Sequence, residues 1–143
     1  MLSLTCKASI KAVIYLGSIQ DADRRASIKE IAEYIGENEH TVGKLLQRLV
    51  HKKIIHSVKG PHGGFYITEQ QAQQPIIKVV EAIDGQEVYH HCGLGMNECN
   101  DSRPCPFHES FKPIREQFQS MCISKRICDL YENVNKGLTY LAG

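Results

Sequence analysis

Residues 27–68, "SIKEIAEYIGENEHTVGKLLQRLVHKKIIHSVKGPHGGFYIT", decide the expected fold of this chain of 143 residues. Apolar side chains recur at helical spacing over residues 28–35, where Gly36 follows as a stop signal, and again from Val42 to Val50. β-Branched and aromatic residues then flank a Gly-rich turn at residues 60–64, which is typical of a β-hairpin. Two short helices joined by a tight turn and followed by a hairpin predict a winged helix-turn-helix.

Further helices are expected on both sides of this unit. Residues 5–17 carry apolar side chains at helical spacing, and residues 76–84 form a short helix after Pro75. Ser27 is expected to cap the helix that follows it, and Glu30 would complete a capping box. The predicted fold class is therefore mainly α with a small β-hairpin wing.

The C-terminal third is expected to hold a long helix suited to dimerisation. Pro113 should kink this helix or mark a restart, and Ser124 should cap a last helix that carries apolar residues from Ile127 to Val134. The apolar residues of the long helix are spaced 4, 3, 4 and 3 apart: Phe107, Phe111, Ile114, Phe118 and Met121. Such a heptad spacing seeks a partner helix, while packing on the same chain stays open as the alternative.

Length and composition are those of a soluble globular protein with one hydrophobic core. The net charge of +1 does not by itself indicate nucleic acid, but residues 24–59 hold eight Lys and Arg against four Asp and Glu. The first residues lack a signal-peptide pattern, and no apolar run is long enough to span a bilayer. We therefore expect a cytoplasmic protein without a membrane partner. Its six cysteines should then be thiols, metal ligands or redox groups rather than disulfides.

A helix-turn-helix presents the N-terminal end of its second helix to base edges in the major groove. That end reads "NEHTVGK" at residues 38–44, and the wing tip at residues 61–64 is narrow enough to reach an adjacent minor groove. Basic residues nearby can meet phosphates, which position a protein without reading sequence. The alternative is a small helical domain whose basic residues are only solvated. The candidate DNA-binding residues are Ser27, Asn38, His40, Thr41, Lys44, Arg48, Lys59 and His62.

A second feature lies at residues 90–108, "HHCGLGMNECNDSRPCPFH", a stretch too rich in Gly, Pro and Asn for a helix or strand. Six residues separate Cys92 from Cys99 and five separate Cys99 from Cys105, so the tight cysteine pairs of zinc knuckles are absent. Wide spacing in a flexible loop suits an iron–sulfur cluster, for which thiolates are the usual ligands. Idle or reactive surface thiols are the other interpretation.

Three cysteines leave a cluster one ligand short, and imidazole can replace a thiolate. His108 is the nearest candidate for the fourth ligand, because it lies three residues past the last of these cysteines; His90 and His91 are the alternatives. The other cysteines lie in apolar, helical surroundings and are expected to be packing residues: Cys6, Cys122 and Cys128.

These features, in this order, resemble one family over almost the whole chain. It is the family of bacterial winged-helix regulators that includes the iron–sulfur cluster regulator IscR, the nitric-oxide sensor NsrR and the cysteine-metabolism repressor CymR. The stretches that carry the resemblance are "LTCKASIKAVIYL", "SIKEIAEYIG", "LLQRLVHKKIIHSVKGPHGGFYIT", "VVEAIDG" and the "CPFH" that ends the cysteine loop. The string "SVKGPHGGF" is particularly specific, as are three cysteines between "IDG" and a long helix.

The resemblance implies a homodimer, paired through the long helix, that binds a roughly palindromic double-stranded DNA operator. It also implies a 2Fe–2S or 4Fe–4S cluster held by Cys92, Cys99 and Cys105. His108 matches the histidine that completes the 2Fe–2S site in the iron–sulfur cluster regulator. An aerobic preparation can lose such a cluster.

Three departures from the family pattern refine these expectations. The first cysteine gap has six residues, where the best-known cluster-binding members have five. Lys7 stands where the nitric-oxide sensor has a ligating carboxylate, and an ammonium cannot bind iron, so a 2Fe–2S cluster completed by His108 is favoured over a 4Fe–4S cluster. Gly43 stands where the iron–sulfur regulator has a base-reading glutamate, so operator specificity does not carry over.

The sequence therefore predicts a transcription regulator, acting as a repressor, whose operator affinity depends on an iron–sulfur cluster. It predicts neither an enzyme nor a small-molecule substrate. One alternative is a cluster-free regulator of the same family that responds to thiol oxidation or to a partner protein. Another is a small zinc or redox enzyme, against which no general base or substrate motif is visible. The expected segments are 1–84 (DNA-binding domain), 85–106 (cluster-binding loop) and 107–143 (dimerisation helix and C-terminal helix).

Overall fold

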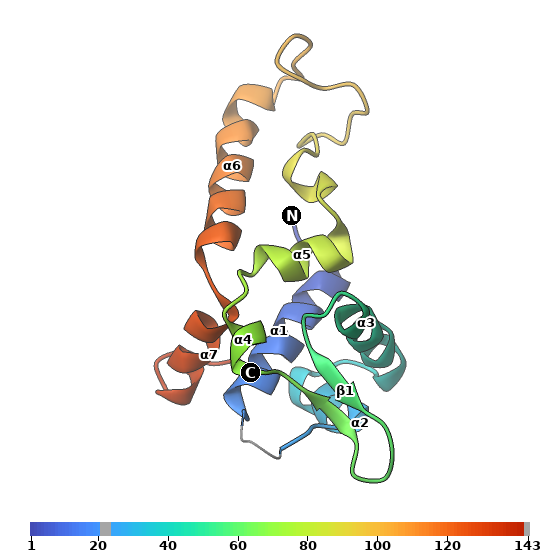
Figure 1. The fold of residues 1–143 in the computed structure, drawn as a ribbon. Coiled ribbons are helices and arrows are strands. Elements are labelled where there is room, and N and C mark those ends of the chain that lie inside the picture. The colour runs from blue at the N-terminus through green and yellow to red at the C-terminus, as the bar shows by residue number, and fades with distance from the viewer. Residues whose placement is uncertain (21–23, 142–143) are drawn as a thin grey trace.

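A computed structural model describes residues 1–20 and 24–141, and it confirms a mainly helical chain with a hairpin wing (Figure 1). The order of elements is α1 (Leu4–Ser18), α2 (Ile28–Ile35), α3 (Glu39–His51), β1 (His56–Val58), β2 (Gly64–Tyr66), α4 (Glu69–Ala72), α5 (Ile77–Asp84), the 3₁₀ helix η1 (Glu87–Tyr89), α6 (His108–Ser124) and α7 (Ile127–Asn135). Within the described ranges, no helix is long and apolar enough to cross a membrane.

Helix α2 of the helix-turn-helix begins and ends at the expected signals. The Ser27 side chain caps α2 by accepting from the backbone N–H of Glu30, and Gly36 ends the helix at a φ of 74°, which favours glycine. The second half of the expected capping box is not formed. The Glu30 carboxylate instead accepts hydrogen bonds from the Tyr15 hydroxyl of α1 and from Arg24. The Glu30 side chain therefore forms tertiary contacts instead of completing the local capping box.

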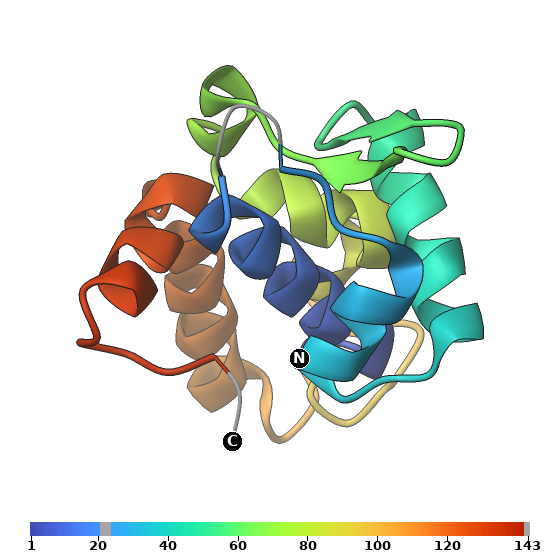
Figure 2. The same ribbon diagram turned by 90° about the horizontal axis from the view of Figure 1, so that it is seen from below.

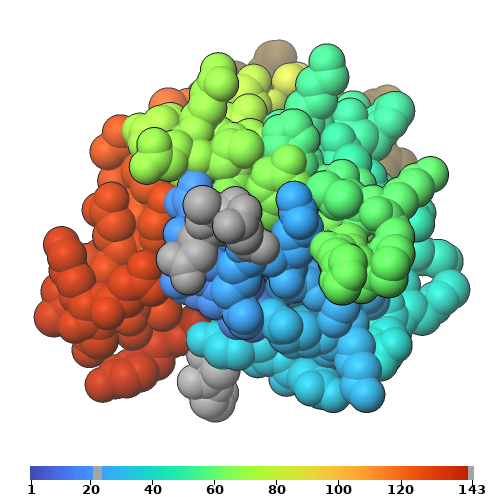
Figure 3. Space-filling view, turned by 60° about the horizontal axis from the view of Figure 1, so that its bottom comes forward, coloured from blue at the N-terminus to red at the C-terminus, as the bar shows by residue number. Residues whose placement is uncertain are grey.

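The wing is an antiparallel hairpin whose turn depends on Gly63. Strand β1 pairs with β2 so that Val58 lies opposite Gly64. A Cβ on Gly63 would lie 2.0 Å from the carbonyl oxygen of Val58, so the turn leaves no room for a side chain there. Ala26 extends the small sheet, because its N–H and carbonyl both bond to the backbone of Phe65. Figure 3 shows the hairpin, in green, projecting at one edge of the molecule.

Helix α1 lies at the centre of the fold. In Figure 2 it has α6 and α7 on one side and α2 and α3 on the other. Helix α7 approaches α1 so closely that a Cβ on Gly17 would lie 2.0 Å from the ring of Tyr131. Cys122, Ile127 and Cys128 belong to the same buried core as the helices of the N-terminal half. The division of the chain into three functional segments stays a prediction, but the C-terminal helices share one core with the winged helix.

One expectation for the C-terminal third was wrong, and another keeps only one of its two options. Pro113 marks no restart, since α6 is continuous through it from His108 to Ser124, so a kink at Pro113 stays a prediction. Ser124 does not cap α7; it is the last residue of α6, and its hydroxyl donates to the carbonyl of Met121. The N-terminal turn of α7 is closed instead by Asp129, whose carboxylate accepts from the backbone N–H of Arg126. A serine at a helix boundary can bond backward into the preceding helix, and here it does so.

Candidate functional site

The cysteine loop lies between η1 and α6, at the end of the molecule opposite the wing (Figure 1). Its backbone is irregular, as its composition predicted. The ligand atoms of Cys92, Cys99 and Cys105 all lie within 4.8 Å of one another, and among the described residues this is the group of thiols, imidazoles or carboxylates placed to hold a metal. The three cysteines are therefore brought together although eleven intervening loop residues separate them along the chain.

Backbone N–H groups point at these sulfur atoms. The N–H of Leu94 lies 3.4 Å from Cys92 Sγ, and that of Cys105 lies 3.4 Å from Cys99 Sγ. Hydrogen bonds from the backbone of Met96 and Leu94 lower the pKa of the Cys92 thiol to about 7. For Cys99, the bond from the Cys105 N–H acts to lower the pKa, but burial and the neighbouring sulfurs outweigh it and the pKa is raised. Cys92 is thus readily available as a thiolate, and the neighbouring sulfurs oppose deprotonation of Cys99.

His108 lies beside this triad and is held from behind. Its side chain is buried, with Nδ1 3.3 Å from Cys99 Sγ and Nε2 2.8 Å from a carboxylate oxygen of Asp101. It touches the triad through Cys99 and is outside the group of mutually close ligand atoms. The carboxylate–imidazole contact favours a proton on Nε2, which leaves the Nδ1 lone pair facing the sulfurs. His90 and His91, the alternative candidates for the fourth ligand, are exposed.

Asp101 was not among the candidate residues, yet it has the most contacts of any carboxylate in the loop. Both of its oxygens accept from the Lys112 ammonium on α6, at 2.9 and 3.0 Å. The hydrogen bond with His108 and the charge of Lys112 lower the pKa of this carboxyl group. An acidic residue a few positions before the candidate histidine was the available signal, but the loop sequence does not say which of its acidic residues faces the imidazole.

The other three cysteines are buried in the core, as predicted. Burial, together with the neighbouring Asp84, raises the pKa of the Cys6 thiol to about 12, and burial also raises the pKa of Cys122. Thiols in such surroundings stay protonated and behave as small apolar side chains. The chain therefore has two sets of three cysteines, one gathered on the loop and one packed in the core.

The expected DNA-binding residues lie on the recognition helix α3, at the start of α2 and on the wing. His40, Lys44, Lys59 and His62 are exposed. Asn38 has a structural role, because its side-chain oxygen caps α3 by accepting from the N–H of Thr41 at 2.8 Å. Ser27 caps α2 in the same way. A side chain that forms an N-cap can still donate through its free hydrogen, but its orientation is set by the helix rather than by DNA.

Arg48 is also exposed, but its guanidinium is engaged within the protein. Nη2 donates to the backbone carbonyls of Ala82 and Ile83 at the end of α5, each at 3.1 Å. Sequence reasoning did not find this contact, because no periodicity in the chain relates residue 48 to residues 82 and 83.

Two basic residues beside the wing were missed as well. Arg24 and Arg25 lie shortly before α2, separated from it by Ala26 and Ser27, and are exposed. The guanidinium of Arg25 lies over the ring of Tyr66 on β2, 5.5 Å from its centroid, so this charge joins the face of the wing. The pair of arginines before the Ser27 cap was the signal, but only the pairing of Ala26 with Phe65 places it at the hairpin.

Comparison with known families matches residues 2–133 to one family, Rrf2, described as iron-dependent transcriptional regulators. The chain belongs to the Rrf2 family. Among curated relatives of this Rrf2 protein, a helix-turn-helix-type regulator of Aquifex aeolicus is 26% identical over 136 residues, which is 94% of this chain and 93% of the relative. The transcriptional repressor NsrR of Streptomyces coelicolor is 21% identical over 122 residues, 85% of this chain and 82% of its own.

Solved structures of Rrf2 regulators share the fold. CymR, the global cysteine regulator of B. subtilis, superposes with a TM-score of 0.73 over 92% of this chain and 96% of its own, at 17% identity. IscR of T. potens gives a TM-score of 0.70 over 98% and 92%, at 14% identity. The expected family and the winged-helix class are thereby confirmed. The Rrf2 family consists of transcriptional regulators rather than enzymes, which removes the zinc or redox enzyme as an alternative.

Proposed function

We propose that this Rrf2 regulator is a cytoplasmic, homodimeric repressor that binds a roughly palindromic DNA operator, and that a 2Fe–2S cluster on the cysteine loop modulates its operator affinity. The observation that carries the proposal is the convergence of Cys92, Cys99 and Cys105 within 4.8 Å in a chain of a family described as iron-dependent. His108, against Cys99, is the proposed fourth ligand.

The donor set fits such a group. Two sulfur ligands of one tetrahedral metal atom lie about 3.8 Å apart when metal–sulfur bonds are about 2.3 Å. The sulfurs of Cys92 and Cys105 are 3.5 Å apart, and Nδ1 of His108 is 3.3 Å from Cys99 Sγ. The four groups thus form two pairs, and each iron of a 2Fe–2S cluster takes two protein ligands. Lys7 is exposed on α1 and offers no carboxylate for a 4Fe–4S site.

The chain's own residues prepare the site before any cluster arrives. Thiols must lose their protons to ligate iron, and the low pKa of Cys92 makes it the first to do so. Asp101 holds the Nε2 side of His108, which orients Nδ1 toward the sulfurs, and Lys112 balances the added negative charge. When bound, the cluster would supply one-electron redox chemistry and sensitivity to oxidants.

The exposed apolar residues on α6 and at its N-cap support pairing between two copies. Phe107, Ile114 and Met121 belong to the predicted heptad seam and are each about half exposed, at 54, 51 and 50%. Phe118 turns inward and packs near Tyr89, with ring centroids 6.1 Å apart. One side of the helix therefore packs on its own chain, and the other offers apolar surface to a partner.

The test begins with anaerobic reconstitution of the purified protein, followed by visible absorption and counts of iron and acid-labile sulfide. We expect about two irons per protomer for a 2Fe–2S cluster. The variant Cys92→Ala should lose the iron, while Cys128→Ala, a buried thiol outside the triad, should keep it. Binding to a duplex selected from random DNA by the same protein should then differ between the loaded and cluster-free forms. A colourless, iron-free product whose DNA binding ignores Cys92→Ala would overturn the proposal.

A specific observation also favours the cluster-free alternative. Cys92 has a pKa of about 7, and its sulfur lies 3.5 Å from that of Cys105, close enough for a disulfide after a small movement. Oxidation of these two thiols by peroxide would form one disulfide and two waters. Peptide mapping after mild peroxide treatment distinguishes the two functions, because a Cys92–Cys105 disulfide that changes DNA binding in iron-free protein supports the thiol switch.

A further inference from the structure

The last turn of α5 is completed by a side chain from the recognition helix. The N–H of Gly85 bonds to the carbonyl of Glu81, and the carbonyls that follow have no partner within the helix. Arg48 supplies the donor for two of them, Ala82 and Ile83, at 3.1 Å each. A guanidinium is favourable at this position, because the C-terminal end of a helix carries partial negative charge. Arg48 therefore caps α5 from α3.

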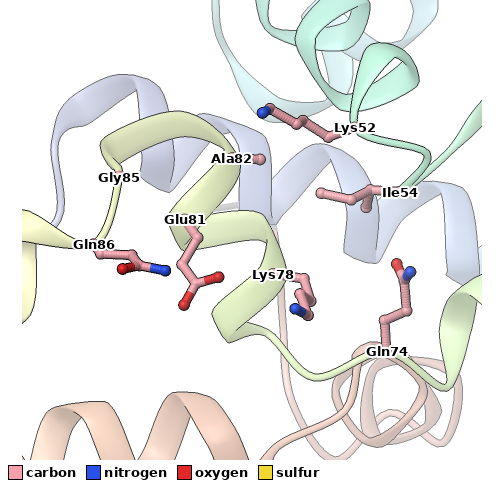
Figure 4. Close-up of a pocket in the computed structure, with 8 residues that line it drawn as sticks. All are labelled: Lys52, Ile54, Gln74, Lys78, Glu81, Ala82, Gly85 and Gln86. Atoms are coloured by element: carbon pink, nitrogen blue, oxygen red, sulfur yellow. The ribbon is translucent and has the colours of Figure 1, made fainter.

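The contact lies at the surface, beside the core that α3 and α5 share through Leu49 and Val79. Two hollows of about 380 and 420 Å³ adjoin it, and both are lined by Lys52 and Ala82. Figure 4 shows the residues that line the first hollow. Ala82 on α5 lies near Lys52, which follows α3, and Gly85 and Gln86 lie where α5 ends. Arg48 itself lines the second hollow, so its contact with α5 lies at the edge of the shared core.

The capped turn leads directly into the cysteine loop. Gly85 breaks the helix at a φ of 75°, and η1 follows with Tyr89 buried. Only residues 85–91 separate the end of α5 from Cys92. The loop lies at the opposite end of the molecule from the wing (Figure 1), so a change in the loop has to reach DNA through the body of the protein. The end of α5 is the point where the loop's chain and the recognition helix meet.

We propose that Arg48 is a positioning residue that couples the cysteine loop to the recognition helix. Binding or loss of the ligand at the loop shifts the segment that precedes Cys92, and the Arg48 contact carries that shift from the end of α5 to α3. The inference rests on the proposed function. Coupling of this kind requires that the two loop states favour different arrangements of α3, as any ligand-driven change in affinity does.

The competing role for Arg48 is a direct contact with a DNA phosphate. The two roles differ in their dependence on salt and on the loop. A phosphate contact contributes equally in both loop states, and its loss lowers the slope of log K against log salt by about 0.9. A coupling contact leaves that slope unchanged and alters the ratio of operator affinities between the loaded and cluster-free protein. Lysine keeps the charge for a phosphate but lacks the fork of donors that arginine offers.

The experiment measures operator affinity for the full-length protein, loaded and cluster-free, across a salt series, in four forms: wild type, Arg48→Gln, Arg48→Lys and Lys44→Gln. Lys44 is exposed on α3 one turn before Arg48 and is the matched control. We expect Arg48→Gln and Arg48→Lys to bring the loaded-to-free affinity ratio, on the order of 5- to 150-fold in coupled systems, to within about 2-fold of unity at an unchanged salt slope. Lys44→Gln should lower the slope and preserve the ratio.

Amide hydrogen exchange of the cluster-free protein gives a second measurement that does not depend on DNA. Arg48→Gln should speed exchange at the amide of Gly85, which closes the last turn of α5, and at the amides of Tyr89 and His90, which close the turns of η1. Lys44→Gln should not change these rates. If the wild-type ratio differs from unity and Arg48→Gln keeps it, the coupling role is overturned. If the wild-type ratio is itself unity, the proposed function fails together with the coupling, and the exchange data still report whether Arg48 caps α5.

Discussion

Substitution of Gly63 by alanine should disable the wing while leaving the rest of the protein folded. The added Cβ would lie 2.0 Å from the carbonyl oxygen of Val58 and 2.9 Å from the carbonyl carbons of Val58 and Lys59. Ordinary contacts begin near 3.4 Å, so about 1.4 Å of separation is missing. All of these neighbours are backbone atoms of the same turn, and no side-chain rotamer relieves the clash. The hairpin has to open or change register, and Lys59 and His62 then lose their positions.

The magnitude follows from where the hairpin lies. All residues of β1 are exposed, so opening the hairpin uncovers little apolar surface. The free energy of unfolding should therefore fall by no more than about 1–2 kcal/mol, a range common for single substitutions. If each wing supplies one phosphate contact, a dimer loses two, and the salt slope falls by about 1.8. Lowering salt from about 200 to about 50 mM would then strengthen binding by the variant about 10-fold less than binding by wild type.

Fluorescence anisotropy on an operator duplex across the salt series measures the slope, and thermal unfolding followed by circular dichroism measures stability. His62→Ala is the matched control, because it removes a wing side chain without altering the turn, and it should change the slope less than Gly63→Ala does. Wild-type affinity and salt slope in a folded Gly63→Ala protein would refute the assignment of the wing as a DNA contact.

Three further outcomes are expected. Asp101→Ala should weaken cluster retention against a chelator by roughly 10- to 100-fold, the usual cost of losing a partner of a ligand histidine, whereas Glu98→Ala in the same loop should have no effect. In reduced, cluster-free protein at pH 8, Cys92 should be alkylated fastest, because its pKa of about 7 makes it mostly thiolate at pH 8. Cys6, with a pKa of about 12, should resist alkylation until the protein unfolds. Mass spectrometry of labelled peptides measures both rates. Gly17→Ala should destabilise the protein by about 1–2 kcal/mol in denaturant unfolding, since the clash with the ring on α7 exceeds the gain in helix propensity of about 1 kcal/mol; a more stable variant would contradict the close approach of α1 and α7.

Local sequence signals were sufficient to predict a structural element wherever the interacting residues lie within one short segment. The caps at Ser27 and Gly36, the recognition helix and the hairpin turn all follow from residues within a few positions of one another. The three loop cysteines were also identifiable, because a Gly- and Pro-rich segment with so many thiols is typical of a metal or redox site. At Ser124 this kind of reasoning failed, since a serine between two helices can bond to either one and the sequence contains both options.

The amino-acid sequence specifies the set of elements and the chemistry available to them: a winged helix-turn-helix, a long helix with an apolar seam and a loop of thiols. Only the tertiary structure shows which side chains from different parts of the chain contact one another. In the folded chain, Asp101 contacts the Nε2 side of His108, and Glu30 accepts from Tyr15 rather than completing its capping box. Arg25 lies over Tyr66 on the wing, and Arg48 donates to the carbonyls at the end of α5. Each of these contacts depends on the packing of elements that no local period relates, and a hydrogen bond or ion pair forms wherever packing leaves a donor facing an acceptor.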